Sequence, residues 1–194
     1  MRTASYSRKT AETDIAITVN IDGTGKSTIQ TGIGFFDHML ILLAKHGYMD
    51  LSVACTGDTY VDGHHTVEDV GIALGTAIKD ALGNKAGIRR YGNFAVPMDE
   101  ALAKVHLDLS GRPFLVFDCA FAGPGCGGFD TQLTEEFFRG LAFAAGITLH
   151  MQVPYGKNDH HKIEALFKAF ARALDVATSF DGRTNDIPST KGVL

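Results

Sequence analysis

The sequence has few cysteines, no excess of positive charge and no long hydrophobic run. Its three cysteines are odd in number and lack the spacing of a metal site, so we expect reduced thiols in a cytoplasmic protein. The formal net charge of −4 gives no support to nucleic-acid binding, which usually requires a basic excess. No apolar run reaches the roughly 18 residues that span a bilayer, and no signal peptide opens the chain, so we expect no membrane partner. The 194 residues are enough for one core or for two small fused units.

The most informative pattern that is present occurs twice. His64-His65-Thr66-Val67-Glu68 and His160-His161-Lys162-Ile163-Glu164 both have the form His-His-x-x-Glu, and each runs into an apolar stretch with helical spacing. Imidazole and carboxylate groups together suit Mn, Fe, Zn or Ni. Two matched copies predict two metal ions or a single site built by symmetry. The alternative is that the paired histidines cap a helix and face the solvent.

Helical geometry divides each histidine pair. Residues i and i+4 share one face of a helix, whereas adjacent residues diverge by about 100°. His64 and Glu68 can therefore bind one metal, while His65 must point elsewhere. The resulting hypothesis has two symmetric ligand sets: His64, Glu68 and His161 for one metal, and His160, Glu164 and His65 for the other.

The duplication extends beyond the motif. Residues 12–23 and 100–111 alternate polar and apolar side chains and end in Asp-Gly or Ser-Gly, which indicates a strand followed by a turn. The elements expected next are return strands at 27–31 and 114–119, helices starting near 35 and 135, and strands at 51–54 and 148–153, each followed by a His-His-x-x-Glu helix. We therefore predict an α+β fold with an internal duplication, in which two similar half-domains each pack a small, mostly antiparallel sheet against helices. The predicted divisions are 1–92, 93–180 and a mobile C-terminal loop over the active site at 181–194.

One segment imitates a phosphate-binding P-loop. Gly23-Thr24-Gly25-Lys26-Ser27-Thr28 ends like that motif, but Asn20 stands where its first glycine is required, and no helix is expected to follow. We predict a hairpin turn between two strands instead.

Two or three side chains do not complete a metal site, so further ligands are needed. His38 lies in the first helix of the first half, and Glu136 occupies the equivalent position in the second half. With them, the two sets become His38, His65, His160 and Glu164, and His64, Glu68, Glu136 and His161. Four protein ligands leave two positions of a six-coordinate metal such as Mn for substrate. The alternatives are a histidine on a helix surface and a solvated acidic first turn at 135–136.

A second group of residues suits a phosphate monoester. Arginine forks and a Ser/Lys loop are typical phosphate ligands, although each alone is more often a surface residue. The candidates are Arg90, Arg112, Ser189 and Lys191.

Together these residues resemble the imidazoleglycerol-phosphate dehydratase family of histidine biosynthesis. The matching segments span nearly the whole chain: residues 8–13, 34–40, 62–69, 90–92, 158–165, 167–174 and 188–192. The resemblance implies a fold like the second domain of ribosomal protein S5, two Mn²⁺ per active site bound by the eight ligands above, and a phosphorylated imidazole as substrate. It also implies a homo-oligomer, a 24-subunit cage with active sites at its interfaces. Relatives that carry histidine at position 136 make Glu136 a departure from the pattern.

The resemblance further implies which residues act on the substrate. Substrate contacts would come from Glu12, His46, Arg90, Arg112, Lys168, Ser189 and Lys191. Catalytic roles would fall to Glu12, His46 and Lys168. The proton to be removed is poorly acidic, so the imidazole ring must serve as an electron sink, which cations at its nitrogens would favour. Glu12 is the candidate base. Rival hypotheses are a dinuclear metallohydrolase and a cage in which metals only join subunits.

Overall fold

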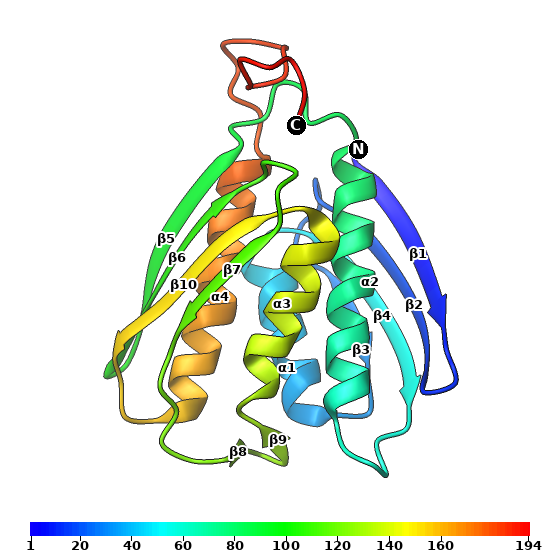
Figure 1. Cartoon of the computed structure of the whole chain (residues 1–194), viewed down its shortest axis with the longest axis vertical. Coiled ribbons are helices and arrows are strands. Elements are labelled where there is room, and N and C mark those ends of the chain that lie inside the picture. Colours follow the sequence, from blue (N-terminus) through cyan, green and yellow to red (C-terminus); the bar gives the residue numbers. More distant parts are fainter.

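Two four-stranded sheets enclose four helices in the computed structural model, which describes residues 1–194 (Figure 1). The first sheet contains β1 (Thr3–Lys9), β2 (Thr13–Asn20), β3 (Ser27–Gln30) and β4 (Asp50–Gly57). The second contains β5 (Tyr91–Met98), β6 (Ala101–Asp108), β7 (Phe114–Asp118) and β10 (Thr148–Tyr155). The helices are α1 (Gly34–His46), α2 (His64–Leu82), α3 (Leu133–Ala145) and α4 (Asp159–Thr178). A small hairpin, β8 (Gly125–Cys126) and β9 (Phe129–Asp130), precedes α3.

Both sheets have the same topology. The strand orders are β1-β2-β4-β3 and β5-β6-β10-β7, and in each sheet only the last pair is parallel. This confirms the predicted α+β duplication with mostly antiparallel sheets. The division predicted after residue 92 falls just inside β5, which begins at Tyr91. Residues 181–194 form no helix or strand and follow the C-terminal end of α4 (Figure 1).

The predicted hairpin after β2 is wrong. β2 pairs with β1 and β4, while β3 pairs with the far side of β4, so residues 23–26 connect strands that are not neighbours. The Oδ1 atom of Asp50 accepts the main-chain N–H groups of Thr24 at 2.8 Å and Lys26 at 3.0 Å. The loop therefore uses its amides internally and leads into a strand, which confirms that it is not a P-loop. The edge strands β1 and β5 were not predicted.

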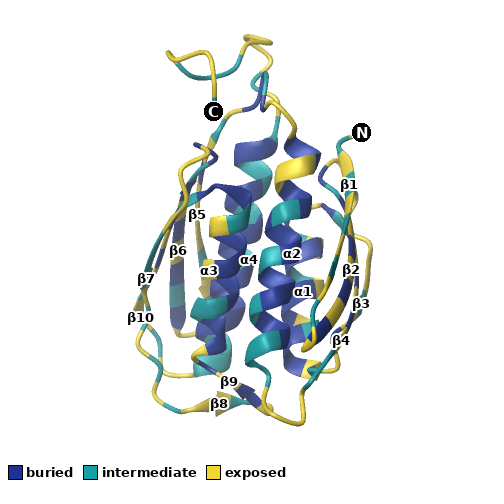
Figure 2. Cartoon of the chain, turned by 45° about the vertical axis from the view of Figure 1, so that its right-hand side comes forward, coloured by how far each residue is buried: buried dark blue, intermediate teal, exposed yellow.

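The hydrophobic core lies between the sheets and is shared by both halves. In β2 the alternate residues Ile15, Ile17 and Val19 are buried, which places one face of the first sheet against the helices. All 47 residues of the main buried cluster belong to one contiguous core, as the dark central helices of Figure 2 illustrate. Neither half buries its apolar surface without the other.

Helices from different halves pack in parallel pairs, α2 with α3 and α1 with α4. A Cβ atom on Gly75 would lie 2.4 Å from the carbonyl oxygen of Leu141, and one on Gly140 would lie 2.9 Å from that of Glu68. Glycine is therefore required where α2 and α3 approach most closely. Parallel packing brings the N-terminal ends of the helices to one end of the molecule. None of the helices is both long and apolar enough to span a membrane.

Candidate metal centre and phosphate site

Local hydrogen bonds set the two motifs at helix starts. The Asn158 side chain accepts the N–H groups of His160 and His161 and so caps α4. The Asp62 carboxylate accepts the N–H of His64 at 2.8 Å, at the first residue of α2. Both histidine pairs are thereby held in the first turn of a long helix.

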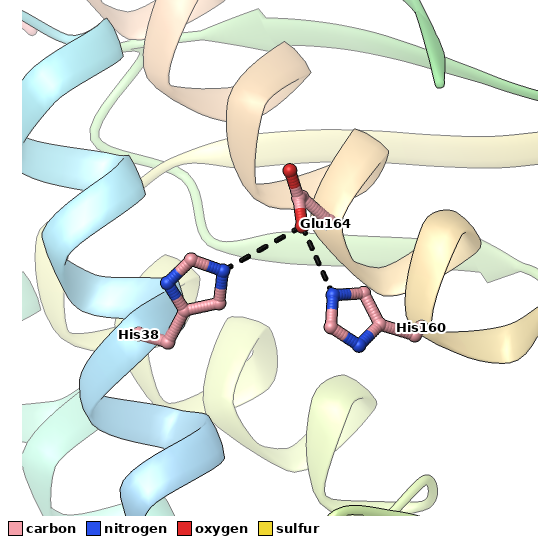
Figure 3. A group of neighbouring side chains, drawn as sticks. All are labelled: His38, His160 and Glu164. Atoms are coloured by element: carbon pink, nitrogen blue, oxygen red, sulfur yellow. Dashed lines mark hydrogen bonds and ion pairs between the residues drawn. The ribbon is translucent and has the colours of Figure 1, made fainter. Parts of the chain in front are cut away.

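Three predicted ligands converge on one point (Figure 3). The Oε2 atom of Glu164 lies 3.1 Å from His160 Nε2 and 3.6 Å from His38 Nε2. Figure 3 shows both imidazoles directed at this carboxylate from α1 and α4, and the three ligand atoms lie within 4.8 Å of one another. Two imidazoles and a carboxylate are a suitable donor set for Mn or Fe. The structure thus brings together three members of the predicted set, whereas His65 lies outside this triad.

The triad carboxylate is held in its anionic form. Burial alone would raise the pKa of Glu164, but the ammonium group of Lys168 and the ring of His160 outweigh burial and lower the pKa. Lys168 Nζ lies 2.6 Å from Oε1 of Glu164, the oxygen atom that does not face the imidazoles. Glu164 therefore offers a charged Oε2 atom to a cation.

His46, at the end of α1, lies within range of the positive charge of Lys168 in α4. Burial lowers the pKa of His46, and the positive charge of Lys168 lowers it further. The ring is therefore neutral at pH 7 and carries one nitrogen that can accept a proton.

The second predicted set is partly assembled in one chain. His64 Nε2 lies 3.7 Å from Glu68 Oε2, and His64 borders a cavity of about 700 Å³ together with Glu136 of α3. Glu136 also lies 3.7 Å from the Arg139 side chain. His161, the fourth predicted member, lies elsewhere.

His65 and His161 instead contact carboxylates of their own half. His65 Nδ1 lies 3.0 Å from Asp58, and His161 Nδ1 lies 2.7 Å from Glu100. Each contact raises the pKa of its histidine. The N–H of Asn158 and the ring of His161 lower the pKa of Glu100 to about 2. Sequence reasoning missed both acidic partners, and only the alignment of the two halves, which pairs position 100 with position 12, marked Glu100 at all.

Glu12, the predicted base, lies beside His65. Its Oε1 atom is 3.7 Å from His65 Nε2, and 52% of its side chain is exposed. Glu12 therefore faces the ring nitrogen of His65 that is not occupied by Asp58.

The predicted phosphate residues form a separate cluster. Arg90, Arg112, Ser189 and Lys191 border a cavity of about 560 Å³. Arg90 donates two hydrogen bonds to the Asp108 carboxylate, at 2.8 and 3.1 Å, so its guanidinium is fixed in place. Asp108 was not identified from the sequence.

This phosphate cluster lies at the opposite end of the molecule from the metal ligands (Figure 1). The N–H of Arg90 donates to the carbonyl of Ala177, in the last turn of α4, whereas His160 is in the first turn. Seventeen residues of helix correspond to about 26 Å. A single chain does not bring the two clusters together.

The sequence of the chain is similar to a known protein family over most of its length. Residues 31–174 match the family model described as imidazoleglycerol-phosphate dehydratase. The imidazoleglycerol-phosphate dehydratase of Acetivibrio thermocellus is 62% identical over 193 residues, covering 100% of this chain and 99% of the relative. That of Listeria welshimeri is 58% identical over 194 residues, with 100% of both chains covered.

Solved structures of the same family have the same fold as this chain. The crystal structure of imidazoleglycerol-phosphate dehydratase from Staphylococcus aureus superposes with a TM-score of 0.84 at 39% identity, covering 92% of this chain and 99% of that one. The enzyme from Pyrococcus furiosus, in complex with (S)-C348, also gives a TM-score of 0.84, at 37% identity, covering 97% and 99%. The chain therefore belongs to the imidazoleglycerol-phosphate dehydratase family.

Proposed function

We propose that the protein is a dehydratase that uses two Mn²⁺ per active site, in a site assembled from neighbouring subunits. As a member of its family, it is a hydro-lyase of L-histidine biosynthesis. The reaction converts D-erythro-1-(imidazol-4-yl)glycerol 3-phosphate to 3-(imidazol-4-yl)-2-oxopropyl phosphate and water.

The observation that carries the metal proposal is the convergence of His38, His160 and Glu164. Two imidazoles and an anionic carboxylate aimed at one point are the groups that a divalent transition metal requires. His64, Glu68 and Glu136 would provide most of a second site. When bound, the two cations would supply positive charge at the imidazole nitrogens of the substrate and so make the ring an electron sink.

Proton transfer and positioning are carried out by side chains of the protein. Glu12 takes the proton from the carbon that keeps its hydroxyl group, and the C–H electron pair forms the C=C bond. The C–O bond at the neighbouring carbon breaks, and its hydroxyl leaves as hydroxide, which takes up one proton from the solvent to become water. The enol that remains becomes the ketone. Lys168 holds Glu164 in place, and neutral His46 is available to hold or pass a proton near Lys168.

The substrate phosphate would bind to Arg90, Arg112, Ser189 and Lys191, which determines the position of the imidazole ring. The substrate is only about 10 Å long by ordinary bond lengths. It cannot bridge about 26 Å within one chain. A neighbouring subunit must therefore bring its phosphate cluster to the metal end of the first.

His65 and His161 fit the same arrangement. They are the two predicted ligands that do not join the ligand sets of their own chain, so each is available to a metal held mainly by a neighbour. We place the assembly at 24 subunits, as the family resemblance implies. The three free cysteines agree with the cytoplasmic location that we propose.

The test is to incubate the metal-free protein with Mn²⁺ and the imidazolyl glycerol phosphate. We expect the oxopropyl phosphate ketone, and we expect Glu12→Gln to retain metal and substrate binding but to lose most of kcat. Release of inorganic phosphate would instead support a metallohydrolase. Assembly on Mn²⁺ without turnover would support a structural cage, and unchanged turnover of Glu12→Gln would remove Glu12 as the base.

A further inference from the structure

The second histidine of each motif is held through the same ring nitrogen. His161 Nδ1 lies 2.7 Å from Oε2 of Glu100, and His65 Nδ1 lies 3.0 Å from Oδ2 of Asp58. A carboxylate can only accept, so the proton of the neutral ring must be on Nδ1. The Nε2 atom then carries a lone pair directed away from the carboxylate. This is the tautomer that binds a metal through Nε2.

Both acidic residues are themselves anchored. Oε1 of Glu100 accepts the N–H groups of Lys157 at 2.9 Å and Asn158 at 2.7 Å, immediately before α4. Glu100 thus ties the β5–β6 turn to the start of the helix that carries His161. The main-chain N–H of Asp58 donates to the Glu12 carbonyl at 3.0 Å, which fixes the loop after β4. The carboxylate of Glu100 is thus fixed directly and that of Asp58 through its main chain, and each restricts the orientation of the ring that it contacts.

The internal duplication shows that this role was divided differently in the two halves. Glu12 and Glu100 occupy equivalent positions, each directly before the second strand of its sheet. Glu100 contacts Nδ1 of its histidine, whereas Glu12 lies on the Nε2 side of His65, at 3.7 Å. In the first half it is Asp58 that contacts Nδ1 of His65, so Glu12 does not make this contact.

We propose that Glu100 and Asp58 are positioning residues that hold His161 and His65 in the Nδ1–H tautomer, with Nε2 presented to a metal bound mainly by a neighbouring subunit. The proposal rests on the metal-binding role of these two histidines in the proposed function. It also accounts for why only one of the two equivalent glutamates is available as a base.

The decisive variant is Glu100→Gln. Its amide oxygen can still accept from Lys157 and Asn158, but its NH₂ group then faces Nδ1 of His161 and favours the wrong tautomer. If the amide flips, the NH₂ group instead meets two main-chain N–H donors. We expect the affinity for Mn²⁺ at one of the two sites per chain to fall about 10- to 100-fold, since partners of this kind have effects of that size. The measurement is titration with Mn²⁺ alone, with free Mn²⁺ followed by electron paramagnetic resonance.

Asp58 separates the effect of charge from that of the hydrogen bond. Both of its oxygens lie near His65 Nδ1, at 3.0 and 3.2 Å, so Asp58→Asn can turn its carbonyl oxygen toward the ring. We expect Asp58→Asn to retain most of the Mn²⁺ affinity that Asp58→Ala loses. The control is Asp80→Asn, the same loss of charge on an exposed residue near the far end of α2, which should leave both sites unchanged.

The proposal is overturned if a folded Glu100→Gln binds two Mn²⁺ per chain with wild-type affinity. If Glu100→Gln does not fold, the Asp58 pair decides, and equal affinities of Asp58→Asn and Asp58→Ala would overturn the proposal. Failure of the proposed function is a different outcome, because there the wild-type protein itself would not bind Mn²⁺ or would not form the ketone.

Discussion

Complementation between two inactive variants tests whether neighbouring subunits build the active site. His38→Ala removes one arm of the triad, while Arg112→Ala/Lys191→Ala removes two charges from the phosphate cluster at the other end. Both side chains of the double variant are largely exposed, so we expect its fold to survive. Loss of hydrogen bonds to a charged group is worth about 1.5–3 kcal/mol each, and two such losses predict a decrease in kcat/KM of at least about 100-fold.

The size of the rescue follows from the separation of the two ends. When the two variants are co-expressed in equal amounts, half of the triads and half of the phosphate clusters in the mixed assemblies are intact. If each active site takes its triad from one subunit and its phosphate cluster from a different subunit, about one quarter of the sites receive both in intact form. Ketone formation should then reach about one quarter of the wild-type rate. If one chain supplied both ends, no site would be intact and the rate would stay at the level of the single variants.

The matched control combines two variants of the same end. His38→Ala and His160→Ala both damage the triad of their own chain, so no mixing of whole subunits restores it. Assemblies purified through two different tags provide the mixed species for both pairs. The composite site is refuted if His38→Ala with the phosphate-end variant is no more active than His38→Ala with His160→Ala.

Two further predictions concern the fold. A Cβ atom on Gly92 of β5 would lie 1.9 Å from a main-chain carbonyl oxygen of α4. Gly92→Ala should therefore destabilise the metal-free protein by about 2–3 kcal/mol and lower its Tm by about 5–10 °C. The control is Gly34→Ala, whose Cβ would have no atom within 4 Å and which should not lower the Tm. An unchanged Tm for Gly92→Ala would contradict the close packing of β5 on α4. The hydrogen bond from Arg2 lowers the pKa of Asp22, so this carboxylate stabilises the fold above its unfolded pKa and ceases to do so as the pH falls through the folded value. Thermal melts should therefore show a deficit in Asp22→Asn at pH 6 that disappears well below pH 4, and a constant deficit would refute the linkage.

Much of the fold follows from local periodicity. Alternation in β2 and β6 and helical spacing after each His-His-x-x-Glu motif correctly predicted two similar α+β halves. The edge strands β1 and β5 escaped detection because β1 buries none of its residues and β5 buries only Gly92, so neither carries a clear apolar alternation. The order of strands was also beyond the sequence pattern, since the insertion of β4 between β2 and β3 is a long-range pairing.

The candidate site divides in the same way. The sequence by itself determined the two motifs, their i,i+4 pairs of histidine and glutamate, and the rotation that turns His65 and His161 aside, because an α-helix repeats every 3.6 residues. The tertiary structure brings His38 to Glu164, as the repeat had suggested, and it alone decided that Glu100 contacts His161 and that the phosphate cluster lies at the far end of the helices. Such meetings depend on how helices from different halves pack around one core, and that packing depends on contacts between residues that are distant in the chain.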